Sequence, residues 1–329
     1  MTRRTLLPLV PIYATAAAAK NALFDYGWAK MRQLRWLVIS VGNISVGGSG
    51  KTPFVICLAR LLQERGLHVD VLSRGYGRNS DAVERVDPAG NAEQFGDEPL
   101  LIARSADVPV YVGASRYAAG ALAESGQAAK GIHILDDGFQ HRRLARTVDI
   151  VLVHRSDLAE ILLPAGRLRE PINSLRRASI LVLREEDRYL EIKLKERGIE
   201  KPIWWIERSI TVPDNLRKMI AFCGIARPDE FFRMLEQHSV EMIGKHAFGD
   251  HHQYRDDDVR QLMQEAQVRS ANSFLTTEKD LVRLSAKHKE MLASAANLQV
   301  AKLAVHLRDE SSIFGDIENL LPSDFKRLL

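Results

Sequence analysis

The sequence predicts an α/β protein with a mostly parallel sheet in a larger lobe and a second, smaller α/β lobe. Apolar segments of strand length alternate with amphipathic segments of helix length, which is typical of parallel sheets covered by helices on both faces. The alternation pauses between residues 202 and 213 and then begins again. The chain has 329 residues, of which 46% are hydrophobic, and this length suits about two domains with full cores.

The elements of the larger lobe follow from apolar periodicity. The first strand is expected at 36–42, and the helix expected at 52–64 carries Val55, Leu58 and Leu62 on one face. Further strands are expected at 68–73, 108–113, 131–136, 150–154 and 179–184. Further helices are expected at 99–104, 115–124 and 187–197. Residues 202–213 read as an extended connector.

The smaller lobe repeats this pattern after the connector. Strands are expected at 219–223, 240–243, 273–276 and 298–305, and helices at 228–237 and 256–266. These patterns divide the chain into an N-terminal membrane-docking segment at 1–35, a larger lobe at 36–210 and a C-terminal lobe at 211–329.

Composition excludes several classes of protein. The hydrophobic share excludes whole-chain disorder, and no uncharged run approaches the ~20 residues that each spanning helix of a polytopic membrane protein needs. Cys57 and Cys223 match no metal-binding spacing and indicate a reducing compartment. The net charge of +4 is too small to indicate nucleic-acid binding.

The basic excess lies at the N-terminus, where residues 1–35 carry six basic side chains and one acidic one. Pro8 and Pro11 interrupt the apolar stretch there, which argues against a secretory signal peptide. The spacing of later apolar residues places a set of them on one helical face: Tyr13, Ala17, Phe24, Trp28 and Met31. Two interpretations stay open, a helix packed on the protein and an interfacial helix on an anionic membrane.

A phosphate-binding loop follows the first expected strand. Its residues are Ser45, Val46, Gly47, Gly48, Ser49, Gly50, Lys51 and Thr52. A glycine-rich loop between a strand and a helix surrounds phosphates with backbone amides, so the larger lobe is expected to be P-loop NTPase-like. Lys51 is expected to contact the β- and γ-phosphates of ATP, and the Thr52 hydroxyl to contact Mg²⁺. Ser45 stands where the strict pattern has glycine.

The second Mg²⁺ ligand is expected to be an acid at the end of another strand. Asp136 and Asp137 follow the apolar residues of the strand at 131–136. Consecutive strand residues point to opposite faces, so one of the two is expected to face the metal. A plain turn before Gly138 is the alternative.

Several motifs together resemble the tetraacyldisaccharide 4′-kinase family of lipid A biosynthesis. Besides the P-loop, they lie in this order at 73–77 (SRGYG), 96–99 (GDEP), 135–141 (LDDGFQH), 163–171 (LPAGRLREP) and 250–252 (DHH). The resemblance covers about residues 5–285 and includes the serine in the P-loop. It implies ATP-dependent phosphorylation of the 4′-hydroxyl of a tetraacyl glucosamine disaccharide 1-phosphate. It also implies a peripheral position on the cytoplasmic face of the bacterial inner membrane.

Two residues are candidates for handling the hydroxyl proton. Asp97, just before a helix start, is the candidate general base, mostly on the resemblance, and a helix-capping role is its alternative. His251, in the other lobe, is expected to orient the Asp97 carboxylate once the lobes close. With Lys51 they form the predicted catalytic set.

Basic residues near the ends of strands are the candidates for binding the acceptor's 1-phosphate. They are Arg74, Arg116, His141, Arg167 and Arg169. Arginine offers a bidentate fork for a phosphate, although each of these residues alone could be a solvated surface charge.

A P-loop protein can also be a nucleotide-dependent switch. In that alternative the chain is a membrane-recruited NTPase that acts on a protein partner. The kinase interpretation predicts a lipid A disaccharide precursor and an anionic membrane surface as partners, with no nucleic acid and no obligate protein partner.

Overall fold

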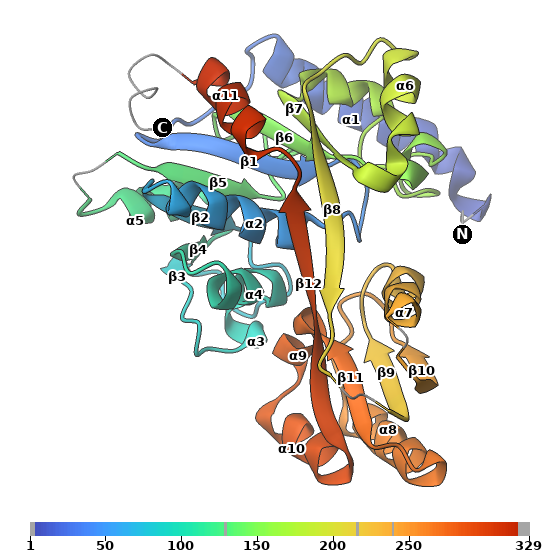
Figure 1. Cartoon of the computed structure of the whole chain (residues 1–329). Coiled ribbons are helices and arrows are strands. Elements are labelled where there is room, and N and C mark those ends of the chain that lie inside the picture. The colour runs from blue at the N-terminus through green and yellow to red at the C-terminus, as the bar shows by residue number, and fades with distance from the viewer. Residues whose placement is uncertain (1–3, 128–129, 215–216, 239, 322–329) are drawn as a thin grey trace.

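The structure, a computed structural model, describes residues 4–127, 130–214, 217–238 and 240–321. Residues 1–3 of the predicted N-terminal segment, with Arg3, and residues 322–329 of the predicted C-terminal lobe lie outside the described residues. The described chain forms two lobes, one above the other in Figure 1, and two long strands run between them. The predicted α/β class, with a mostly parallel sheet, is confirmed.

The first lobe contains seven strands of the sheet and the helices between them. The strands are β1 (Leu37–Asn43), β2 (Val69–Ser73), β3 (Glu84–Arg85), β4 (Val110–Val112), β5 (Ile132–Asp136), β6 (Val148–Leu152) and β7 (Ile180–Arg184). The α-helices are α2 (Lys51–Glu64), α3 (Ala92–Phe95), α4 (Asp97–Ser105), α5 (Arg116–Glu124) and α6 (Tyr189–Lys195). Short 3₁₀ helices lie at η2 (Arg155–Leu158), η3 (Ile172–Arg177) and η4 (Glu185–Asp187).

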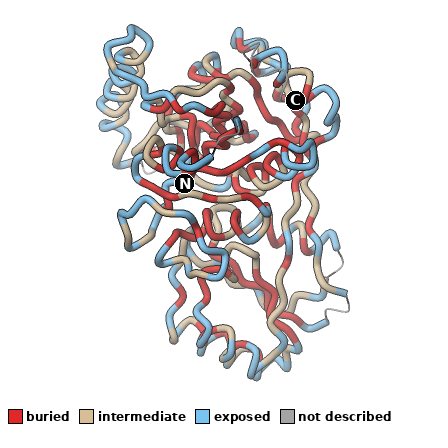
Figure 2. The backbone as a smooth tube through the Cα atoms, turned by 90° about the vertical axis from the view of Figure 1, so that its left-hand side faces the viewer, coloured by how far each residue is buried: buried red, intermediate tan, exposed pale blue. Residues whose placement is uncertain are grey.

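Alternate residues of the central strands enter different hydrophobic clusters. Ile39 and Val41 of β1 pack with Leu58 of α2 on one face, whereas Val38 packs with Ala119 of α5 on the other. Every residue of β1, β2 and β5 is buried, as expected for parallel strands covered on both faces. Figure 2 shows buried residues along the strands of both lobes.

The second lobe is built on β9 (Met219–Cys223), β10 (Met242–Ala247) and β11 (Ser273–Thr277). Its helices are α7 (Pro228–Gln237), α8 (Asp256–Arg269), α9 (Glu278–Arg283) and α10 (Ala286–Ala295). β9 pairs in parallel with β10 and β11. The predictions at 219–223 and 228–237 match β9 and α7, whereas α9 and α10 were not predicted.

Two strands connect the lobes, β8 (Ile203–Thr211) and β12 (Asn297–Leu307). The first residues of β12 pair in parallel with β11, and Lys302–Leu307 pair antiparallel with β8. The sheet order is therefore continuous, β10-β9-β11-β12-β8-β7-β6-β1-β5-β2-β4-β3. The expected connector is a nine-residue strand because Trp204, Ile206 and Ile210 alternate into the core.

The C-terminal residues return to the first lobe, in contrast to the expected lobe at 211–329. After β12, helix α11 (Glu310–Leu320) places Ile313, Phe314 and Ile317 in the cluster that also contains α2. The red helix α11 accordingly lies in the upper lobe of Figure 1.

The N-terminal residues form η1 (Arg4–Leu9) and α1 (Val10–Asp25) on the surface of the first lobe. Trp28 and Met31 lie beyond the end of α1, so the predicted five-residue face does not exist as one helical stripe. The Arg142 guanidinium covers the Phe24 ring, with its Cζ 5.2 Å from the ring centroid, whereas Trp28 is 76% exposed. Thr5–Asp25 is long and apolar enough to cross a membrane by length and composition, a test that signal sequences also pass.

Candidate active site

A cleft of about 750 Å³ lies between the lobes, at the carboxyl ends of the parallel strands of both. The first lobe contributes the P-loop and the residues after β2 and β5, and the second contributes the loops after β9 and β11. Ligands of open α/β sheets bind at this edge, where strand ends and helix N-termini converge.

The P-loop conformation depends on its glycines. Gly47, Gly48 and Gly50 have φ angles of +74°, +66° and +85°. A Cβ atom on Gly47 or Gly48 would also lie within 2.8 Å of the second lobe, at Ala226 or Arg227. Ser45 instead forms a bridge to Leu168 and is buried, so this position does not need glycine.

Lys51 and Thr52 are the first two residues of helix α2, which follows the loop directly. The Lys51 ammonium donates to Asn43 Oδ1 at 3.0 Å and lies 3.3 Å from Asp137. Thr52 is 8% exposed and lines the cleft. Both side chains are therefore held where the phosphates of a nucleotide enter a P-loop.

Asp136 and Asp137 occupy different environments. Asp136 ends β5, its Oδ2 accepts from Ser73 at 2.9 Å, and its buried Oδ1 has no partner among the described residues. Burial and the neighbouring carboxylates of Glu98 and Asp137 raise the pKa of Asp136 to about 7. Asp137 has φ +51° and pairs with Arg169 at 2.8 Å. Despite burial, Lys51 and Arg169 hold the pKa of Asp137 well below its usual range. Of the two carboxylates, Asp136 is thus the one without an ion pair among the described residues.

Asp97 is the first residue of α4, and Gly96 is the N-cap residue of this helix. One carboxylate oxygen of Asp97 accepts from the Glu98 amide at 2.9 Å. The other accepts from His251 Nδ1 at 3.0 Å and from Arg283 Nε at 2.7 Å. Although burial alone acts in the opposite direction, His251, Lys279 and Arg283 hold the pKa of Asp97 well below its usual range. The carboxylate bridges the two lobes.

His251 stands between Asp97 and the cleft. Its ring lines the cleft and packs edge-on against the Tyr76 ring, with the two ring centroids 5.4 Å apart. Its backbone has φ +58°, a strained conformation for a residue other than glycine, and its amide donates to Gly224 O. His252 instead hydrogen-bonds Asp258 at 2.9 Å, so the two neighbouring histidines have separate roles.

Four of the five predicted acceptor residues line the cleft, together with Lys20 of α1. They are Arg74, Arg116, His141 and Arg169. Arg116 is buried, and its Nε has no partner among the described residues. Burial and Arg116 lower the pKa of His141 to about 4, so the ring is neutral at pH 7. Arg167 instead braces the P-loop, donating to Val46 O at 3.0 Å.

Sequence reasoning missed the second-lobe residues that support Asp97. Arg283 is 1% exposed and joins Asp97 to Asp280 and to Gly224 O. Lys279 pairs with Glu98 at 2.7 Å. Both follow β11, so polar residues after a predicted strand were the available signal.

The chain is similar to known proteins over nearly its whole length. A family model described as Tetraacyldisaccharide-1-P 4′-kinase matches residues 2–321. A Tetraacyldisaccharide 4′-kinase of Koribacter versatilis (strain Ellin345) is 40% identical over 325 residues, 95% of this chain and 98% of the relative. One of Aquifex aeolicus (strain VF5) is 38% identical over 301 residues, 86% of this chain and 90% of the relative. The crystal structure of an "apo" form of LpxK from Aquifex aeolicus in complex with ATP aligns with a TM-score of 0.76 and 33% identity, covering 97% of this chain and 99% of that chain.

Proposed function

The chain belongs to the tetraacyldisaccharide-1-P 4′-kinase family, and from this premise we propose how its cleft carries out phosphoryl transfer. The protein is an ATP-dependent kinase that phosphorylates the 4′-hydroxyl of a tetraacyl disaccharide 1-phosphate. This phosphorylation is a step of lipid A biosynthesis. The observation that carries the mechanism is the meeting of a P-loop and the Asp97–His251 pair at one cleft. The family supports the kinase and not the switch on a protein partner.

ATP binds with its phosphates in the P-loop. The loop amides and the N-terminus of α2 surround the phosphate chain, and Lys51 contacts its β- and γ-groups. Phosphoryl transfer needs positioning and charge neutralisation more than covalent help. The loop therefore supplies most of the electrostatic stabilisation, and Asn43 and Asp137 keep Lys51 in place before ATP arrives.

Mg²⁺ suits the residues beside the P-loop. The described residues contain no group of three or more His, Cys, Asp or Glu that could hold a metal by themselves. Mg²⁺ in kinases is typically held by one or two protein oxygens, water and the phosphates, and the Thr52 hydroxyl and the partnerless Asp136 Oδ1 fit that pattern. When bound, the ion neutralises charge that develops on the phosphates.

The Asp97–His251 pair receives the hydroxyl proton. The 4′-oxygen forms a bond to the γ-phosphorus, the bond from that phosphorus to the β–γ bridging oxygen breaks, and ADP leaves. His251 lines the cleft and Asp97 lies behind it, so the two act as one proton-accepting unit rather than as separate groups. Arg283 and Lys279 keep the unit anionic and oriented.

The acceptor enters from the side of the cleft bordered by α1. Arg74, Arg116 and neutral His141 are the proposed contacts for its 1-phosphate, and Lys20 joins them from α1. Arg169 is neutralised by Asp137 and Arg167 is engaged by the P-loop, so these two are better placed to support the nucleotide side.

The acyl chains of the acceptor stay in the bilayer, so the protein must dock on a membrane. Among the described residues, 15 large hydrophobic side chains are exposed, and seven of them precede residue 32: Leu7, Leu9, Ile12, Leu23, Tyr26, Trp28 and Met31. Tyr13 and Asn21 tie the opposite side of α1 to Arg169 and Glu170 beside the cleft. Exposed apolar side chains on η1, on α1 and just after α1, in a segment tied beside the cleft, support peripheral docking on the cytoplasmic face of the inner membrane.

The kinase function is tested with purified full-length protein, labelled ATP and a tetraacyl disaccharide 1-phosphate. We expect label to appear on the 4′-position of the lipid, located by NMR, and Lys51→Ala to abolish it. Release of label only as inorganic phosphate, with no dependence on the lipid, would contradict the proposed function.

A further inference from the structure

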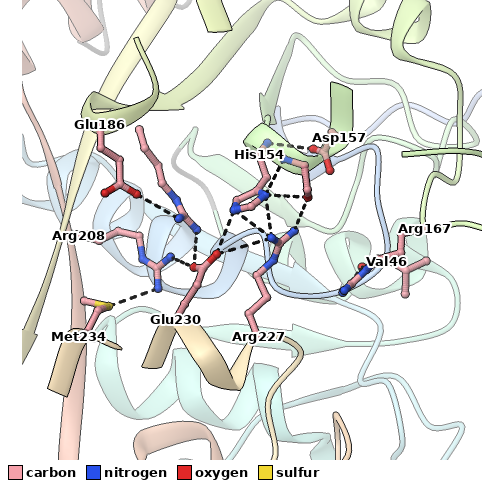
Figure 3. A network of polar contacts seen from close by, with 11 residues as sticks. Val46, His154, Asp157, Arg167, Glu186, Arg208, Arg227, Glu230 and Met234 are labelled. Atoms are coloured by element: carbon pink, nitrogen blue, oxygen red, sulfur yellow. Dashed lines mark hydrogen bonds and ion pairs between the residues drawn. The ribbon is translucent and has the colours of Figure 1, made fainter. Parts of the chain in front are cut away.

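A cluster of charged side chains joins the two lobes beside the P-loop (Figure 3). Its centre is Glu230 of α7, which is 14% exposed. Glu230 accepts from Arg184 at the end of β7 at 3.0 Å and from Arg208 of β8 at 2.7 Å. The cluster therefore includes the first lobe, the connecting strand and the second lobe.

His154 and Arg227 complete the cluster on the side of the P-loop. Nδ1 of His154 accepts from the Ser156 amide at 3.1 Å, so the proton of a neutral ring is placed on Nε2, which lies 3.1 Å from Glu230 Oε1. Arg227 Nη1 lies 2.8 Å from His154 Nδ1 and 3.6 Å from Glu230 Oε1. Arg227 thus contacts the His154 ring, donates to Ser156 Oγ at 3.2 Å and has one more distant carboxylate partner.

Three arginines of the cluster converge on one carboxylate, that of Glu230. The further acids nearby are Glu186, which is exposed and pairs with Arg184 at 3.4 Å, Asp157, which accepts from the His154 amide, and the buried Asp187. The buried Nε atoms of Arg208 and Arg227 have no partner among the described residues. Both arginines line the cleft that contains the P-loop. Guanidinium groups that have such an Nε atom and line a shared cleft favour an anionic ligand.

Arg227 lies against the P-loop, where the phosphates of a nucleotide are expected. A Cβ atom on Gly48 would lie 2.7 Å from Arg227 Cγ and 2.9 Å from Arg227 Nε, so the arginine stem rests on the P-loop backbone. Gly48 precedes Lys51 by three residues, in the part of the loop whose amides surround phosphates.

We propose that Arg227 binds the phosphate chain of the nucleotide from the second lobe, and that Glu230 and His154 are positioning residues that hold it beside the P-loop. The inference rests on the proposed function, because it assumes ATP in this cleft. Binding of ATP then adds a contact between the second lobe and the P-loop, beside the contact of His251 with Asp97 that already joins the two lobes.

The test compares nucleotide affinities of the full-length protein by calorimetry and by competitive inhibition. Arg227→Ala is expected to weaken ATP binding about 10–100-fold, the effect of losing a charge-assisted hydrogen bond to phosphate. The inhibition constant of adenosine, which lacks phosphates, is expected to stay unchanged. Arg227→Lys is expected to recover part of the ATP affinity, and Arg233→Ala, at an exposed arginine of α7, the helix that Arg227 precedes, is the matched control.

The positioning role is tested with Glu230→Gln. It is expected to weaken ATP binding less than Arg227→Ala, and the double variant is expected to bind ATP no more weakly than Arg227→Ala alone. Wild-type ATP affinity in Arg227→Ala, or an equal loss of adenosine and ATP, would overturn the inference. Failure of the wild type itself to bind ATP would instead contradict the proposed function, and Lys51→Ala marks the signal of a disabled P-loop in the same assay.

Discussion

At the scale of single residues, Asp97 is the most sensitive position for the chemical step. Asp97→Asn keeps the shape of the side chain but removes the charge that faces His251 and Arg283. We expect kcat to fall by about 10²–10⁴ with little change in the KM for ATP, as for the loss of a general base. Asp107→Asn, at an exposed position just after the same helix, is the control and should keep normal kcat.

The affinity for Mg²⁺ is expected to depend on pH through Asp136. Its pKa is raised to about 7, so below this pH its carboxyl binds a proton that Mg²⁺ must displace. The apparent affinity for Mg²⁺ should therefore fall about tenfold between pH 8 and pH 6, measured by titrating the ATP-bound protein with Mg²⁺.

ATP itself also titrates in this range, so Asp136→Asn is the necessary comparison. The variant should bind Mg²⁺ more weakly at every pH and should retain only the part of the pH dependence that belongs to ATP. An identical pH dependence in both proteins would show that Asp136 does not hold the ion.

Several site residues could be identified from sequence because their signals are local. A P-loop lies between one strand and the next helix, and Asp136 follows one strand. Arg283 follows the strand predicted at 273–276, but its contact with Asp97 could not be predicted, since the two residues are 186 positions apart and the contact depends on how two lobes pack. The same holds for Arg227 and Glu230, whose partners lie in β7, β8 and the loop after β6.

At the scale of elements, α1 is predicted to be the membrane contact. Ile12 and Leu23 are 67% and 45% exposed on this helix, and Phe24 is covered by Arg142. Replacing Ile12 and Leu23 with serine should weaken binding to anionic vesicles about tenfold or more and raise the KM for the lipid. The KM for ATP should not change, because neither residue borders the cleft.

The matched control replaces Tyr189 and Ile192, two exposed apolar residues of α6, with serine. This control should keep wild-type vesicle binding in a flotation assay. Equal weakening in both variants, or normal binding after the α1 substitutions, would place the docking surface elsewhere. High salt should release the protein only partly, since basic residues contribute about 1 kcal/mol each at an anionic surface and apolar burial persists in salt.

Element types were predictable where periodicity was strong, and element boundaries were less so. β9 and α7 have the predicted bounds, and most strands of the first lobe shift by one or two residues. The predicted N-terminal face was wrong because α1 ends at Asp25 and the chain turns at Gly27, which has φ +73°. Trp28 and Met31 continue the helical spacing only because apolar residues happen to occupy those positions, and they lie outside the helix.

At the scale of the whole molecule, the path of the chain explains how two lobes share one site. β12 pairs first with β11 in the second lobe and then with β8 towards the first, so the chain crosses between the lobes twice. A pattern read in chain order could predict a second lobe after residue 210 but not the return of α11 to α2. That return depends on contacts between segments about 250 residues apart in the sequence.

Catalysis is expected to depend on a proton-accepting pair assembled from both lobes, and a double-mutant cycle of kcat on Asp97 and His251 measures that dependence. The two residues are 154 positions apart and 3.0 Å from each other. If they act as one unit, Asp97→Asn combined with His251→Ala should be little slower than Asp97→Asn alone. A loss in the double variant equal to the product of the two single losses would contradict the account, because His251 would then act independently of Asp97.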